Sequence, residues 1–272
     1  MNQWLKNKFN SQNTVNYKNN KGIIMKATSK YYLQIADNAL VLSHRLSEYC
    51  SHAPFLEEDL ANTNVALDLI GTAESIYVKL AEIEGVKNSD DFAYRRKESE
   101  FLNCLLVEQP NTDFAHIMVR QFLMDSFNFY FYSKLAESKD AFLRALALKT
   151  IKEVTYHLRR SSEWLIRLGD GTQEANDRTQ AALNHLWKYS HELFETSEVD
   201  QEMISKGIGV DLAEIKPLFI QKVNEICYMA NLKLPDTSFK ISGGKSGKHS
   251  EYLGHILCEM QFLPSKYPDA VW

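Results

Sequence analysis

The sequence has little of what marks membrane or nucleic-acid-binding proteins. Its 272 residues contain no apolar run close to the roughly 18–20 residues that cross a bilayer. The formal net charge of −4 gives no general positive field that would attract a phosphate backbone. We therefore expect neither a membrane nor a nucleic acid among the partners of this chain.

Cysteine is also scarce, and its spacing excludes the common thiol motifs. The four residues are far apart and form no CxxC pair: Cys50, Cys104, Cys227 and Cys258. Such spacing in a chain of this size predicts buried, reduced cysteines in a cytoplasmic protein, and argues against a disulfide framework or a thiolate zinc site.

The first 26 residues differ in composition from the rest. They hold five lysines, no acidic residue and many asparagines, and they lack the apolar core of a secretory signal. We expect residues 1–28 to be either a disordered tail or a spurious extension ahead of a start at Met25. Residues 29–272 are then expected to form a single domain.

Proline is rare, and its six positions lie mostly between segments of helical periodicity. Apolar residues recur at three- and four-residue intervals, which predicts an all-α chain. The predicted helices span residues 29–50, 55–84, 112–137, 140–168, 173–195, 211–231 and 249–263. Four long helices with short connections predict a four-helix bundle with additional C-terminal helices.

Ionisable residues interrupt the apolar faces of these helices. Asp125 lies within FAHIMVRQFLMDSFNFYFY, and Glu153 and His157 lie within KTIKEVTYHLRRSSEWL. Burial of a charge is costly unless the charge is paired or bound to a metal. The positions therefore indicate a metal site, or a hydrogen-bonded network where such a site once was.

The ligand pattern of di-iron helical bundles separates these two possibilities. Such proteins place a carboxylate on each of two helices and a Glu-x-x-His pair on each of the other two. In this sequence Asp68 is followed three residues later by Gly71, which offers no ligand. Glu153 and His157 are four residues apart rather than three. The helical skeleton of the pattern is present, but its ligands are incomplete.

The first helix does not supply the missing ligands. It carries Asp37 and His44 but no glutamate in its first half. We interpret the remaining candidates as a degenerate site that binds no metal and contributes no catalytic residue. An autonomous metal-dependent oxidase that uses them is the alternative. These candidates are Asp68, Asp125, Glu153 and His157.

Two further segments of the sequence allow predictions about their surroundings. The helix at 112–137 is apolar nearly all round, so either later helices of the chain or a partner subunit must cover it. Residues 242–247 are expected to form a flexible, Gly-rich loop, and GGKSGKH fails the P-loop pattern. We expect Lys245, Lys248 and His249 to be solvated, while a contact with a ligand phosphate is the less favoured alternative.

Long collinear stretches resemble one known family. LQIADNALVLSHRLSEYCSHAP, DLANTNVALDLIGTAESIY, FLNCLLVEQPNTDFAHIMVRQFLMDSF, TIKEVTYHLRRSSEWLIRLGDGT and GGKSGKHSEYLGHILCEMQFL are similar to the C subunits of bacterial phenylacetyl-CoA 1,2-epoxidases. The similarity covers about residues 30–263. It implies a ferritin-like fold and a place in phenylacetate catabolism.

The resemblance also implies an assembly. In that family an A subunit, itself ferritin-like, carries the di-iron centre and binds the CoA ester, while the C subunit is its non-catalytic structural partner. A reductase with flavin and an iron–sulfur cluster passes electrons from NADPH. This chain would then hold no cofactor of its own and would act only within the monooxygenase complex. A free-standing helical interaction protein is the remaining alternative.

Overall fold

The computed structural model describes residues 25–236, 239–268 and 270. Every regular element within these residues is a helix. The first helix begins at Ala27, two residues before the expected start of the domain. Of the tail expected over residues 1–28, residues 1–24 lie outside the described residues, whereas Ala27 and Thr28 already belong to the first helix.

Four long helices form the bundle predicted from the sequence. They are α1 (Ala27–Ser47), α2 (Leu56–Glu84), α4 (Phe114–Leu135) and α5 (Ala141–Gly169). Asp140 caps α5 by accepting bonds from the backbone N–H groups of Phe142 and Leu143. Gly85 ends α2 in the left-handed conformation that glycine adopts without strain. The prediction of an all-α bundle is therefore confirmed, with boundaries within three residues of those expected.

Shorter elements complete the chain. They are α3 (Asp91–Tyr94), α6 (Gln173–Ser190), α7 (Glu198–Ser205), α8 (Leu212–Met229), α9 (Glu251–Met260) and α10 (Phe262–Lys266), with 3₁₀ helices at Glu98–Glu100, Leu105–Glu108, His191–Phe194 and Gly244–Ser246. The helix expected at 249–263 is two helices, and α7 was not expected at all. Its start carries a signal that could have found it, because Ser197 and Asp200 form a capping box.

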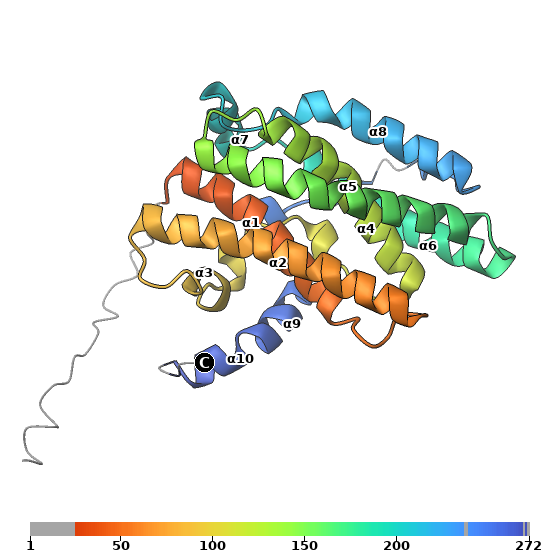
Figure 1. Ribbon diagram of the computed structural model, residues 1–272, viewed down its shortest axis with the longest axis horizontal. Helices are drawn as coiled ribbons and strands as arrows, with labels where there is room; N and C mark the ends of the chain where they lie inside the picture. Colours follow the sequence, from red (N-terminus) through yellow and green to blue (C-terminus); the bar gives the residue numbers. More distant parts are fainter. Residues whose placement is uncertain (1–24, 237–238, 269, 271–272) are drawn as a thin grey trace, which may run out of the picture.

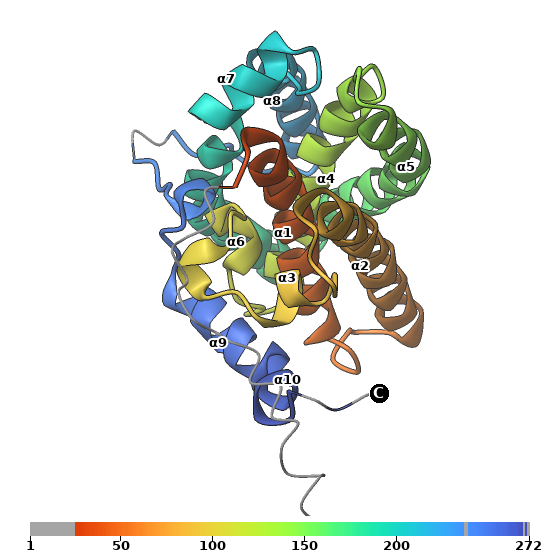
Figure 2. The same ribbon diagram turned by 90° about the vertical axis from the view of Figure 1, so that its left-hand side faces the viewer.

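The long helices pack as two antiparallel pairs, α1 with α2 and α4 with α5 (Figure 1). The view along the bundle in Figure 2 places α1 and α4 near the centre, with α2 and α5 on the outside. Helices α5, α6 and α8 all pack against α4. Phe127, Phe131 and Tyr132 are buried within the chain, so its own elements cover most of α4 and the partner-subunit alternative is not needed there.

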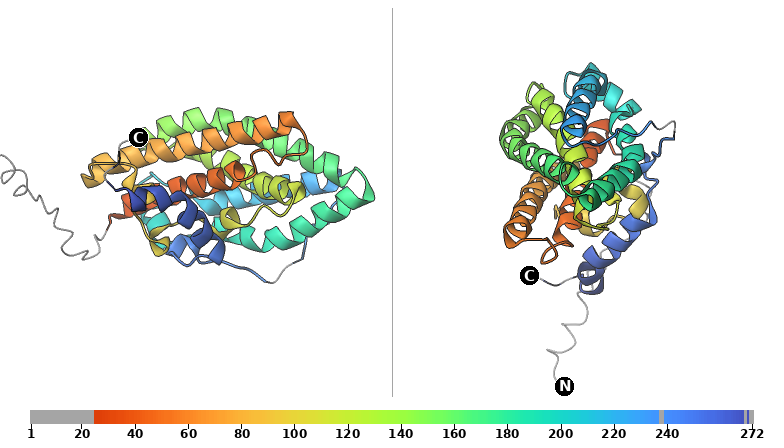
Figure 3. Two further views of the ribbon diagram at one scale, coloured as in Figure 1. Left: turned by 90° about the horizontal axis from the view of Figure 1, so that it is seen from below. Right: turned by 90° about the vertical axis from the view of Figure 1, so that its right-hand side faces the viewer.

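The C-terminal helices lie apart from this core. Helix α9 packs against α1 and the 3₁₀ helix Glu98–Glu100, and α10 continues along the outside of the molecule (Figure 3). Of the four free cysteines, Cys104 and Cys227 are buried as expected, whereas Cys50 and Cys258 are exposed because they lie at the edges of the bundle. No helix among the described residues has the length and apolarity that crossing a membrane requires.

Candidate functional site

An interior polar cluster lies between α4 and α5, at the position the sequence indicated. Asp125 is only 1% exposed. Gln121, one turn earlier on α4, donates its Nε2–H to Asp125 Oδ1 at 2.7 Å. The Ser161 hydroxyl on α5 donates to Asp125 Oδ2 at 2.8 Å, and Ser161 Oγ also lies 3.0 Å from the His157 carbonyl oxygen. Both carboxylate oxygens of Asp125 are therefore already hydrogen-bonded within the protein.

His157 extends this cluster toward α2. Its Nε2 donates to Asp68 Oδ2 at 2.9 Å, while its Nδ1 has no partner among the described residues. The His157 side chain is buried, but the Asp68 side chain is 38% exposed. The pair thus joins the interior of the bundle to its outer surface. We refer to Asp68, Gln121, Asp125, His157 and Ser161 together as the inner cluster.

The expectation that Glu153 belongs to a buried network with Asp125 and His157 is wrong. The Glu153 side chain is 25% exposed, and its nearest ion-pair partner is Lys149 Nζ at 4.0 Å. Glu153 lies at the edge of the apolar stripe of α5, where its side chain stays partly exposed. Asp68, rather than Glu153, is the carboxylate that pairs with His157.

Burial changes the acid strength of these groups. Burial raises the pKa of Asp125 to about 6, although His157, Ser161 and Gln121 act in the opposite direction. The pKa of Glu153 is also raised, first by burial and then by the nearby charge of Asp68. A carboxyl that is easily protonated at this position is a weaker metal ligand than an ionised one.

The residues present do not fit a di-iron centre. Asp125 has both oxygens engaged, and Asp68 and His157 are bonded to each other. Gly71 has no side chain, so this position offers no ligand. Across the part of the chain that the structure describes, no group of three or more His, Cys, Asp and Glu side chains is arranged to hold a metal ion.

The two candidates of the first helix lie elsewhere. Asp37 is fully buried and pairs with Arg96, at 2.5 Å from Nη2 and 2.9 Å from Nη1. It also accepts from the Tyr77 hydroxyl at 2.6 Å and from the Leu102 N–H at 2.8 Å. His44 bonds to the Leu40 carbonyl oxygen of its own helix. Neither residue adds a ligand to the inner cluster.

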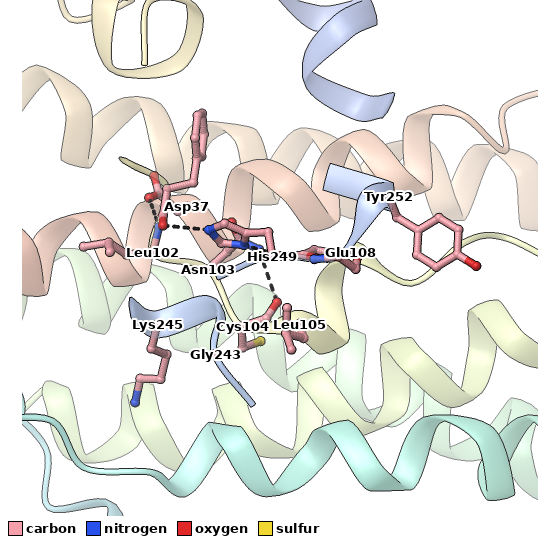
Figure 4. A network of polar contacts seen from close by, with 12 residues as sticks. Asp37, Leu102, Asn103, Cys104, Leu105, Glu108, Gly243, Lys245, His249 and Tyr252 are labelled. Carbon is pink, nitrogen blue, oxygen red and sulfur yellow. Dashed lines mark hydrogen bonds and ion pairs between the residues drawn. The ribbon is translucent and has the colours of Figure 1, made fainter. Parts of the chain in front are cut away.

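A second polar cluster, which sequence reasoning missed, holds the irregular segments together (Figure 4). Glu108 is fully buried, and its Oε1 accepts from His249 Nδ1 at 2.5 Å and from Asn103 Nδ2 at 2.9 Å. Its Oε2 accepts from the Ser250 N–H at 2.9 Å and from the Ser250 hydroxyl at 2.6 Å. The other ring nitrogen of His249 donates to the Phe101 carbonyl oxygen at 2.8 Å.

The His249 ring is therefore charged. Both of its nitrogens face acceptors, which only the imidazolium form satisfies. Burial lowers its pKa, but the bond to Glu108, the charge of Glu108 and the Phe101 carbonyl outweigh burial and raise it. We refer to Glu108, His249, Asn103, Ser250 and the Phe101 carbonyl as the loop cluster.

The Gly-rich loop is packed rather than flexible. Glu192 accepts bonds from the N–H groups of Leu105, Gly243 and Lys245. A Cβ at Gly244 would clash with the Asn103 carbonyl oxygen, and Gly247 lies equally close to the backbone at residue 99. The expectation of a flexible, solvated loop is therefore wrong here, because close backbone contacts hold it in place.

The three basic side chains of this loop differ in exposure. The His249 side chain is fully buried, and Lys245 donates to the Glu195 carbonyl oxygen at 2.7 Å with its side chain 15% exposed. Only Lys248 is exposed as expected. His249 and Lys245 are thus engaged within the protein and are not free to contact a CoA phosphate.

The bundle interior also contains a small cavity between α1 and α4. Its volume is about 50 Å³, and Asn38, Met124 and Phe131 are among its lining residues. Sites for small molecules usually measure roughly 300–1,000 Å³, so this cavity is far too small for an acyl-CoA.

Comparison with known proteins identifies the family. Residues 14–272 match the family described as phenylacetic acid catabolic protein. The chain is also 42% identical over 248 residues to the C subunit of the 1,2-phenylacetyl-CoA epoxidase of Escherichia coli strain K12, an alignment that covers 91% of this chain and 100% of the relative. The chain therefore belongs to the phenylacetic acid catabolic protein family, a family of ferritin-like helical proteins.

Proposed function

We propose that this chain is the structural, non-catalytic C subunit of a phenylacetyl-CoA 1,2-epoxidase in aerobic phenylacetate catabolism. The observation that carries the proposal is the 42% identity to a C subunit along the whole length of that relative. In this role the chain stabilises a second ferritin-like chain, the A subunit, which carries the di-iron centre and binds the CoA ester.

The geometry of the inner cluster supports the non-catalytic part of the proposal. Its acidic and imidazole groups are engaged with one another, and Gly71 stands where a histidine ligand would be needed. The iron then belongs to the A subunit, and the NADPH, flavin and iron–sulfur chemistry belongs to the reductase. The reduced state of the free cysteines suits the cytoplasm, where we place the complex.

Reconstitution tests the proposal. The chain is purified alone and together with the A subunit, treated with ferrous iron, and analysed for bound metal. Consumption of phenylacetyl-CoA is then followed with reductase, NADPH and oxygen. We expect stoichiometric iron only when the A subunit is present, and turnover only with both chains and the reductase.

Two results would replace the structural role by an autonomous oxidase. One is two irons bound to the isolated chain and lost in Asp125→Ala. The other is turnover by this chain with the reductase alone. A chain that stays monomeric beside the A subunit would also contradict the proposal.

A further inference from the structure

The outer side of α2 presents a row of apolar side chains to solvent. We call this row the α2 face. Its members are Leu56, Leu60, Leu67, Ile70 and Val78. They are 38–70% exposed, whereas apolar residues on the opposite side of the helix, such as Leu69 and Ile76, are buried in the core. A soluble monomer gains nothing from a long exposed apolar row, so such a row marks an interaction surface.

The position of α2 leaves this face open. The helix packs against α1 on its inner side and against α5 along one edge (Figure 2). At the middle of the face lies Gly71, where an added Cβ would meet nothing within 4 Å. Glycine is unfavourable inside a helix, yet here no contact within the chain requires it. The empty space above Gly71 lets a partner helix approach the backbone closely.

The charges around the face indicate what kind of chain fits it. Glu57 and Glu82 are exposed beside the apolar row, and the exposed Glu74 lies within the row, between Ile70 and Val78. Lys79 is the only basic residue in α2, and it pairs with Glu82 at 2.8 Å. A second copy of this chain placed face to face would bring two acidic borders together, which is unfavourable. The fitting partner is a different helical chain whose apolar face is bordered by lysine and arginine.

We propose that the α2 face is the docking surface for the iron-bearing A subunit, an inference that rests on the proposed function. Leu60, Leu67 and Val78 fill the partner's grooves, and the helix of the partner crosses α2 over Gly71. The exposed Asp68 carboxylate, on the α5 side of this face, is then covered together with its bond to His157.

Two variants of the full chain test the surface in co-purification and titration with the A subunit. Leu67→Glu places an acid in the centre of the row. Gly71→Met fills the open space, and methionine favours the helix more than glycine does, so weaker binding cannot be ascribed to unfolding. We expect both to weaken association by at least about tenfold. The matched control is Met229→Glu on α8, since Met229 is 51% exposed and Leu67 is 60% exposed.

The outcomes separate the two proposals. Wild-type binding that is lost in Leu67→Glu and Gly71→Met but kept in Met229→Glu supports the α2 face. Unchanged binding of the first two variants overturns the face and leaves the structural role intact. No binding of the wild type overturns the proposed function and the docking surface with it. Self-association in sedimentation that Leu67→Glu abolishes would make a second copy the occupant and overturn the choice of partner.

Discussion

The two buried polar clusters of this molecule differ in how completely their charges are satisfied. In the loop cluster both oxygens of Glu108 and both ring nitrogens of His249 have partners. In the inner cluster one nitrogen of His157 has no partner among the described residues, and Asp68 is partly exposed. Asn103 Oδ1 of the loop cluster and Gln121 Oε1 of the inner cluster also lack a partner among the described residues, so the two clusters differ in the pairing of their charged groups.

The reason lies in the backbone that each cluster touches. The backbone N–H and C=O groups within α4 and α5 bond to one another, so these helices do not need the side chains of the inner cluster as hydrogen-bond partners. The segments at 96–109 and 242–250 form little regular structure, and their buried backbone groups need side-chain partners. Glu108 and Glu192 supply those partners. Loss of the loop cluster should therefore cost more than loss of the inner one.

Removal of Glu108 is expected to have the largest effect. Glu108→Ala leaves the buried His249 imidazolium and the Ser250 N–H without their acceptor. Stranding one member of a buried ion pair costs roughly 3–5 kcal/mol. Urea unfolding measures the change. The control is Glu82→Ala, whose side chain is 63% exposed, with an expected change below about 1 kcal/mol. Equal losses in the two variants would contradict the stabilising role of the loop cluster.

Asp125 is expected to make stability depend on pH. Its pKa is about 6 in the folded protein and 3.8 as the ordinary value, so the fold favours the protonated form. The contribution of Asp125 to the free energy of unfolding is then largest below pH 4 and falls as the pH rises toward 6, by about 3 kcal/mol at roughly 1.4 kcal/mol per unit. Asp125→Asn cannot ionise and should remove this fall. The test is the wild-type minus variant difference in unfolding free energy between pH 4 and 7; a flat difference would contradict it.

His249 is expected to cause a second loss of stability, at higher pH than the loss caused by Asp125. Its raised pKa means that the stability from its charge is present below pH 6.5 and is lost as the pH rises through the raised value. This second decline should persist in Asp125→Asn and disappear in His249→Gln. The two clusters are thus distinguished by the pH window in which each loses stability.

Two glycines should respond in opposite directions to the same substitution. Gly244→Ala forces a methyl group against the Asn103 backbone and should destabilise the fold by about 1–3 kcal/mol. Gly71→Ala enters open space within a helix and should stabilise it by about 0.5–1 kcal/mol. Thermal unfolding of both variants measures this. A destabilised Gly71→Ala would mean that the space above α2 is already filled.

The sequence predicts the helices and part of the inner cluster, for a physical reason. Helical periodicity relates residues three and four apart, so Asp125 and His157 could be assigned to inward faces. It does not resolve edge positions, which is why Glu153 was placed inward and Asp68 was not seen as its replacement. The exposed apolar side of α2 was also missed, since most of its circumference is apolar and periodicity alone does not say which side packs.

The loop cluster could not be predicted in the same way. Glu108 and His249 are 141 residues apart and lie at the ends of irregular segments, where no periodicity relates their directions. The glycines at 243, 244 and 247 indicate a turn, but they indicate mobility as readily as tight packing. Only the packing of the C-terminal segment against residues 99–105 distinguishes the two. Asp37 and Arg96 illustrate the same point, since their pairing depends on where a loop returns to α1.

The smallest expected effect is that of Glu153, and it tests whether this residue belongs to the inner cluster. Glu153→Ala removes a partly exposed carboxylate that lies 4.0 Å from Lys149, and exposed pairs of this kind contribute less than about 1 kcal/mol. His157→Ala removes a buried ring and its bond to Asp68, with an expected loss of about 1–3 kcal/mol. Urea unfolding of both variants at pH 7 measures the loss of unfolding free energy in each. If Glu153→Ala costs as much as His157→Ala, and the double variant costs less than their sum, then Glu153 belongs to the inner cluster after all. That result would reopen the interpretation of Asp68, Asp125, Glu153 and His157 as a functional ligand set.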